Sequence, residues 1–124
     1  MLVLAVCFGL QGYRAVNYAP QKTALQAIQE LKPTKILLFH AKWCGDCQKH
    51  VPFISNIFSQ LQTIIPQVEI NQIEVDYNKQ DQNGLTKQFK ITKIPTIIIL
   101  RGKHLCKLTE YPKVTWEDDM ADCF

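Results

Sequence analysis

The stretch "KILLFHAKWCGDCQKHVP", residues 35–52, decides the fold of this chain. It opens with a continuous apolar run, which is typical of a strand covered on both faces of a largely parallel sheet. After the two cysteines, apolar residues recur at the three- and four-residue steps of one helix face: Val51, Ile54, Phe58 and Leu61. The stretch therefore predicts a buried strand that leads directly into a long helix, with Cys44 and Cys47 at the junction.

The flanking sequence continues the alternation of helices and strands. A turn at Arg101 and Gly102 between two strand-like runs is a hairpin signal, and Thr115 followed by three acidic residues favours a helix start. The apolar spacing predicts the remaining elements, which are helices over 23–32, 83–91 and 116–124 and strands over 68–77, 95–100 and 103–111. This order predicts an α/β fold with a central mixed β-sheet flanked by helices.

Length and composition describe one globular domain without repeats or linkers. Of the 124 residues, 47% are hydrophobic and 20% are charged, a balance that excludes an intrinsically disordered chain. The basic residues are spread along the chain and form no run with interleaved aromatic residues, so nucleic acid is not an expected partner.

The first 17 residues differ from the rest of the chain. They open with the apolar run "MLVLAVCFGLQGY", which resembles a signal-peptide core but lacks a basic start and is shorter than the roughly 20 residues that span a bilayer. Two interpretations stay open: residues 1–17 are a signal or anchor, or they include a buried first strand, and residues 18–124 form the domain. The protein is accordingly expected in the cytoplasm, or exported or membrane-attached through this segment alone.

The spacing of Cys44 and Cys47 fits a redox pair, an inert disulfide or half of a zinc site. A thiol where a strand enters a helix lies among unpaired N–H groups at the positive end of the helix dipole, which favours the thiolate. A zinc site needs two further ligands, and on a helix His50 would lie about 120° around the axis from Cys44. We therefore adopt the redox interpretation and expect no metal.

Two motifs together resemble one known family. "FHAKWCGDCQKHVP", residues 39–52, resembles the active-site segment of the thioredoxin family, and "KIPT", residues 93–96, resembles its cis-proline loop. The resemblance covers residues 18–112 and implies a thioredoxin-like fold. It also implies a thiol–disulfide oxidoreductase that acts on protein disulfides, requires no organic cofactor, and depends on a reductase or another electron donor as partner.

The resemblance also implies roles for individual residues of the motif. Cys44 would be the attacking thiol and Cys47 the resolving thiol of a mixed disulfide with the client protein. Trp43 would shield the pair, and Gly45 and Asp46 would complete the active-site loop.

The second motif would supply the surface that holds the client. The backbone of Ile94 would hydrogen-bond an extended client segment, and Pro95 would be the cis-proline facing the cysteines, although a trans proline that starts a strand is the plainer interpretation. A thioredoxin-fold binding module with little redox turnover is the alternative function.

The chain departs from the family where protons are handled. Leu38 stands where the family usually has a buried aspartate, Gln72 stands for its usual lysine partner, and His40 replaces a second tryptophan. Burial is expected to raise the pKa of Cys47, which must lose a proton to resolve the mixed disulfide. Water, Asp46 or His40 remain as acceptors, unless His40 is only a packing or surface residue.

The chain has five cysteines, and those outside the motif carry no assigned role. Cys106 lies in a predicted strand, and we interpret it as an unpaired cysteine that packs as a small hydrophobic residue. A disulfide to Cys123 is the alternative, because connectivity cannot be derived from spacing.

Overall fold

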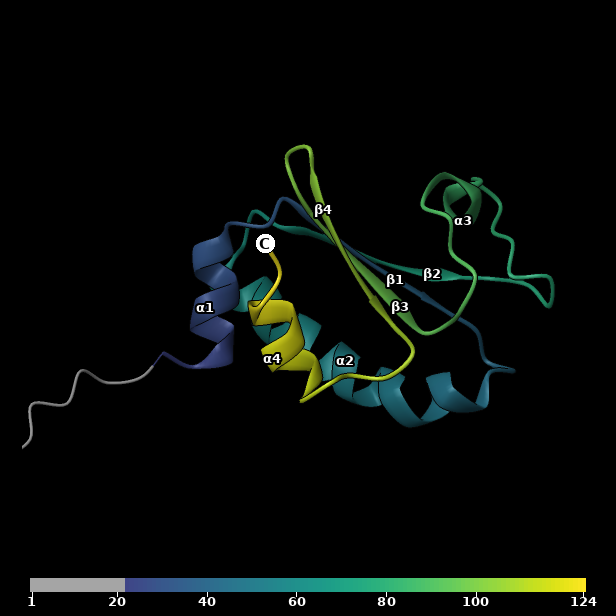
Figure 1. The fold of residues 1–124 in the computed structure, drawn as a ribbon, viewed down its shortest axis with the longest axis horizontal. Coiled ribbons are helices and arrows are strands. Elements are labelled where there is room, and N and C mark those ends of the chain that lie inside the picture. The colour runs from purple at the N-terminus through teal and green to yellow at the C-terminus, as the bar shows by residue number, and fades with distance from the viewer. Residues whose placement is uncertain (1–21) are drawn as a thin grey trace, which may run out of the picture.

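The computed structural model describes residues 22–124, so the predictions for residues 1–17 lie outside the described residues. A mixed four-stranded sheet with strand order β2-β1-β3-β4 forms its centre (Figure 1). The elements are α1 (Ala24–Leu31), β1 (Lys35–His40), α2 (Gly45–Ile64), β2 (Glu69–Glu74), α3 (Leu85–Gln88), β3 (Thr96–Arg101), β4 (His104–Thr109) and α4 (Trp116–Ala121). The predicted α/β architecture is confirmed.

The strand directions follow from the connections. β1 and β2 are parallel because α2 carries the chain back across the sheet between them, whereas β3 is antiparallel to β1 and forms a hairpin with β4. The carboxyl end of β1 and the amino end of β3 therefore lie side by side, with Phe39 opposite Thr96. This pairing brings the two sequence motifs together at the end of the sheet where β1 finishes and β3 begins.

Helices cover the two faces of the sheet unequally. α1, α2 and α4 lie on one face and the short α3 lies on the other (Figure 1). Alternate residues of β1 point to opposite faces, so Ile36 and Leu38 pack among side chains of the three helices, whereas Leu37 and Phe39 pack with the cysteine motif on the other side. The uninterrupted apolar run of β1 thus reflects burial on both faces.

Local capping explains where the first and last helices begin. Thr23 accepts a hydrogen bond from the backbone N–H of Gln26, whose side chain accepts one from the backbone N–H of Thr23. Thr115 caps α4 by accepting from the N–H of Asp118, as predicted. Within residues 22–124, no helix combines the length and the apolar character needed to cross a membrane.

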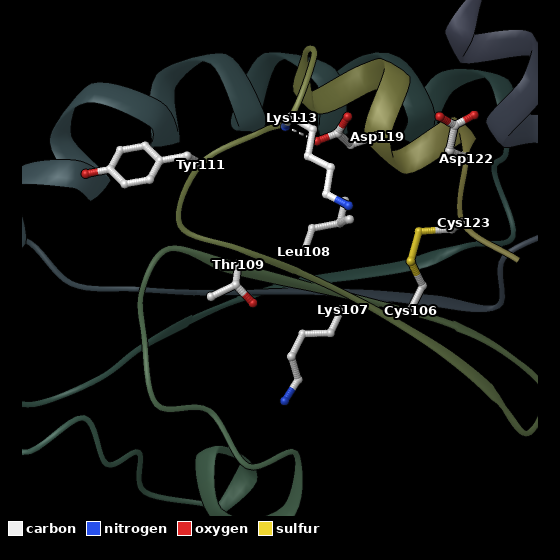
Figure 2. Close-up of a pocket in the computed structure, with 9 residues that line it drawn as sticks. All are labelled: Cys106, Lys107, Leu108, Thr109, Tyr111, Lys113, Asp119, Asp122 and Cys123. Carbon is white, nitrogen blue, oxygen red and sulfur yellow. Dashed lines mark hydrogen bonds between the residues drawn. A yellow bond between two sulfur atoms is a disulfide. The ribbon is translucent and has the colours of Figure 1, made fainter.

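Cys106 and Cys123 form a disulfide (Figure 2), so the interpretation of Cys106 as an unpaired residue is wrong. Cys106 lies on β4, and Cys123 follows α4. Because α4 folds back over the sheet, it brings the two Cα atoms to 5.7 Å, a distance typical of disulfides. The bond joins the C-terminal helix to the edge strand, a pairing that depends on the path of the chain and not on local sequence.

Candidate active site

Cys44 lies at the start of α2, where the sequence predicted it. It is the N-cap residue, and its Sγ accepts a hydrogen bond from the backbone N–H of Cys47 at 3.1 Å. The thiol donates in turn to the carbonyl oxygen of Ile94 at 3.7 Å, and the peptide bond between Ile94 and Pro95 is cis. The structure therefore brings together the two motifs that the sequence separates by 50 positions.

Cys47 lies deeper than Cys44. The exposed fraction is 2% for Cys47 and 8% for Cys44, and both are free thiols. Burial, reinforced by a hydrogen bond with Cys44, raises the pKa of the Cys47 thiol to about 12. The direction agrees with the expectation from sequence, and it means that this thiol needs a proton acceptor in order to react.

A hollow of about 350 Å³ opens beside Cys44. The active-site loop residues Trp43, Gly45 and Asp46 line one side, and Ile94 lines another. The expected loop residues and Ile94 therefore surround the first cysteine, and the hollow leaves open space beside it.

The loop after β2 contributes residues that sequence reasoning missed. Tyr77 is 81% exposed and stacks on Trp43 with the ring centroids 5.3 Å apart. The carboxylate of Asp76 holds this loop by accepting from the backbone N–H groups of Asn78 and Gln80. Parallel strands end on the same side of a sheet, so the pairing of β1 with β2 is what brings Tyr77, shortly after β2, to Trp43.

Three charged side chains also line the hollow without having been expected there. They are Lys79, Lys93 and Glu110, and the Lys93 ammonium lies 3.4 Å from the Glu110 carboxylate. Lys93 precedes Ile94 in the sequence, so its place beside the hollow could have been predicted. Lys79 and Glu110 come from other loops, so only the tertiary structure places them beside the cysteine.

Residues on the α2 side of the pair interact away from the sulfurs. The Nδ1 atom of His50 accepts a hydrogen bond from Nε1 of Trp116 at 3.2 Å, so this nitrogen is not directed at the cysteines. A hydrogen bond with the Asp46 carboxylate is the main cause that raises the pKa of Tyr111 above its ordinary value. No group of three potential metal-ligating side chains converges anywhere between residues 22 and 124.

The positions of the missing proton-handling pair are filled by other side chains. Leu38 is wholly buried and lies between Gln72 on β2 and Ile97 on β3. The Gln72 amide donates to the hydroxyl of Ser55 at 3.2 Å. Neither Leu38 nor Gln72 offers a carboxylate that could take the proton of Cys47.

His40 and Cys47 line a second cavity, of about 300 Å³, whose walls include Val51 and Pro52. Burial lowers the pKa of His40, and the carboxylate of Glu74 opposes this effect. A third hollow, of about 430 Å³, lies beside the disulfide between β4 and α4 (Figure 2) and is lined by other residues than the free cysteines.

Comparisons with known proteins agree with the fold. The family model described as Thioredoxin matches residues 16–121. A thioredoxin of Alicyclobacillus acidocaldarius subsp. acidocaldarius is 35% identical over 99 residues, which cover 78% of this chain and 87% of that protein. Thioredoxin domain-containing protein 11 of Bos taurus is 27% identical over 82 residues, or 66% of this chain, and the chain spans 8% of its length.

A solved structure agrees at the level of fold alone. The crystal structure of thioredoxin O2 from Arabidopsis thaliana in its oxidized state superposes with a TM-score of 0.51 at 19% sequence identity. The superposition covers 72% of this chain and 73% of that chain.

Proposed function

The chain belongs to the thioredoxin family of thiol–disulfide oxidoreductases, and from that premise we propose that it exchanges its Cys44–Cys47 dithiol with disulfides of protein clients. The observation that carries the proposal is the position of Cys44. Its sulfur accepts an N–H at the start of α2 and opens onto a hollow beside Ile94. A hydrogen-bond donor and a helix start both favour the thiolate, which is the nucleophile in disulfide exchange.

The reaction takes place in two steps. The Cys44 thiolate attacks one sulfur of a client disulfide, forms a mixed disulfide, and releases the other client sulfur as a thiolate that takes up a proton. Cys47 then loses its proton and attacks the Cys44 sulfur, which frees the second client thiol and leaves a Cys44–Cys47 disulfide. Two electrons pass from the dithiol to the client, and no organic cofactor takes part.

The hollow beside Cys44 is proposed as the place where the client chain lies. An extended client segment would pair with the backbone of Ile94 next to Pro95, while Trp43 and Tyr77 offer it an exposed aromatic surface. Pro95 has no N–H to donate, so it leaves no unpaired donor at this end of the loop.

Repeated turnover requires a partner that returns electrons to the Cys44–Cys47 disulfide. We propose a reductase if the protein is cytoplasmic, or a membrane-linked donor if residues 1–17 act as a signal or anchor for the domain formed by residues 18–124. Mass spectrometry of the native protein tests this part, since an export signal predicts a mature chain that begins beyond Gly9.

Reduction of insulin by dithiothreitol tests the activity. The wild-type protein is expected to accelerate precipitation of the insulin chains, and Cys44→Ser is expected to give only the uncatalysed rate. A wild-type protein that binds insulin without accelerating the reaction would support the binding module instead.

The reduction potential tests the direction of electron flow. Equilibration of the Cys44–Cys47 pair with glutathione buffers, read by alkylation and mass spectrometry, is expected to give a value near that of thioredoxin, about −270 mV. A value near −120 mV would mean that the protein oxidises its clients.

A further inference from the structure

The second step of the proposed reaction requires a proton acceptor beside a buried thiol. Cys47 is almost inaccessible, and burial opposes formation of its thiolate. Leu38 supplies no acid or base, because its side chain is apolar and wholly buried. Another group must therefore take the proton when Cys47 attacks the mixed disulfide.

The cavity of about 300 Å³ on the α2 side of β1 reaches Cys47 and contains His40 in its wall. His40 ends β1 and lies on the same face of the strand as Leu38, two positions further on. A cavity of this size has room for water molecules, and one water can carry a proton between groups that do not touch.

We propose that His40 is the base that accepts the Cys47 proton, through water in the cavity that both side chains line. The inference rests on the proposed disulfide exchange and assigns one residue of its second step. Histidine is smaller than the tryptophan that the family has at this position. Its side chain therefore leaves space for the cavity and places a basic nitrogen in the cavity wall.

The other polar side chains near Cys47 are less suited to this role. Lys42 lines the cavity but its ammonium offers only donors, and the amide of Gln48 donates to the backbone carbonyl of Lys42 at 2.8 Å. Asp46 lines the hollow beside Cys44, not this cavity, and its charge raises the pKa of Cys47. His40 alone among these groups combines a place in the cavity with a basic nitrogen.

Burial and the charges around His40 together favour its neutral imidazole, which is the form that can accept a proton. Burial and the Lys42 ammonium lower its pKa, whereas the Glu74 carboxylate on β2 raises it. Burial is the larger effect, so the pKa of His40 lies below its usual value and the imidazole is neutral at pH 7. From α2, the uncharged Cys47 thiol and Gln48 amide line the same cavity as His40.

The step balances without a further reagent. The Cys47 S–H bond breaks, its proton passes through water to His40, and the sulfur forms a bond to Cys44 while the bond between Cys44 and the client sulfur breaks. The client leaves as a thiolate and takes up a proton, and the imidazolium of His40 returns its proton to solvent.

Stopped-flow reaction of the reduced protein with excess 5,5′-dithiobis(2-nitrobenzoate) separates the two steps. Release of the first thiolate depends on reagent concentration and reports attack by Cys44, whereas release of the second is independent of concentration and reports attack by Cys47. His40→Gln is expected to slow the second phase about a hundredfold at pH 7 and to leave the first phase unchanged. His104→Gln, which changes an exposed histidine of β4, is the matched control and is expected to leave both phases unchanged.

Rescue by added imidazole distinguishes a chemical role of His40 from a purely structural one. In His40→Ala the emptied space is expected to admit added imidazole, which restores the second phase in proportion to its concentration. In the wild type, the acid limb of the second phase is expected to follow the titration of His40 measured by NMR, which requires no variant.

Outcomes that contradict the proposal are distinguishable from failure of the function. If the wild type shows both phases and His40→Gln retains the wild-type second phase from pH 5 to 9, or imidazole fails to rescue His40→Ala, the assignment of His40 is wrong. If the wild type itself shows no second phase, the disulfide exchange is wrong instead.

Discussion

The two cysteine pairs of this chain are both largely buried, yet they differ in chemistry. Cys44, Cys47 and Cys123 are each less than a tenth exposed, so burial does not separate the reactive pair from the structural one. The difference lies in the surroundings. Each pair borders a hollow, but Cys44 is a free thiol that accepts an N–H at a helix start, whereas Cys106 and Cys123 are bonded to each other and join β4 to the end of α4. The position of Cys44 at a helix start, and not open space, is therefore the feature on which the proposed exchange at this pair rests.

Loss of turnover is the largest effect expected from this comparison. Cys44→Ser and Cys47→Ser are each expected to reduce catalysed insulin reduction to less than about 1% of the wild-type rate, because each removes a sulfur that forms a bond. Cys47→Ser is expected to accumulate clients as mixed disulfides, and Cys44→Ser to trap none. The double variant Cys106→Ala/Cys123→Ala is the control and should keep its turnover. Equal losses in the control would remove the distinction between the two pairs.

Alkylation rates give the next largest contrast. At pH 7, iodoacetamide is expected to modify Cys44 at least about a hundredfold faster than Cys47, because the pKa of about 12 leaves Cys47 almost entirely protonated. Cys106 and Cys123 should stay unmodified without a reductant, since a disulfide has no free thiol. Peptide mass spectrometry over a time course measures all four positions. Similar rates at Cys44 and Cys47 would contradict their assigned order.

Leu38→Asp tests whether proton transfer limits the rate at which the Cys44–Cys47 pair reduces a client. The wild-type rate of client reduction is expected to fall as the pH drops through the titration of His40, because the raised pKa of Cys47 makes its attack depend on a base. A carboxylate at position 38 is expected to increase the rate near pH 7 several-fold and to lower the free energy of unfolding by about 4 kcal/mol, because a wholly buried side chain becomes polar.

Single-turnover reduction of a model disulfide from pH 6 to 9 measures the first effect, and urea unfolding measures the second. Leu38→Asn is the matched control, since it introduces a polar side chain that cannot accept the proton. Superimposable pH profiles of wild type and Leu38→Asp would mean that this position affects packing alone.

The disulfide is expected to contribute stability and little else. Removing it in Cys106→Ala/Cys123→Ala releases a loop of 17 residues and is expected to lower the free energy of unfolding by about 3 kcal/mol. Urea unfolding with and without a reductant checks the value, because reduction of the wild type should produce a similar loss. The alkylation rate of Cys44 is expected to change by less than about twofold. A large change in that rate would mean that α4 influences the active site through the contact between Trp116 and His50.

Sequence alone determined the order of the elements and the position of the cysteine motif. The apolar run of β1, the helical spacing after Cys47 and the capping Thr115 each act within a few residues, so their structural meaning is local. The direction of the pKa shift of Cys47 also followed from its expected burial at the start of α2.

The tertiary structure alone decided which distant residues meet. The pairing of Cys106 with Cys123, the stacking of Tyr77 on Trp43 and the shared cavity of His40 and Cys47 all join separate elements. Their contacts depend on strand order, on where each loop returns to the sheet, and on the space left between side chains. None of these is encoded in a short window of sequence, because each arises only after the sheet and the helices have packed together.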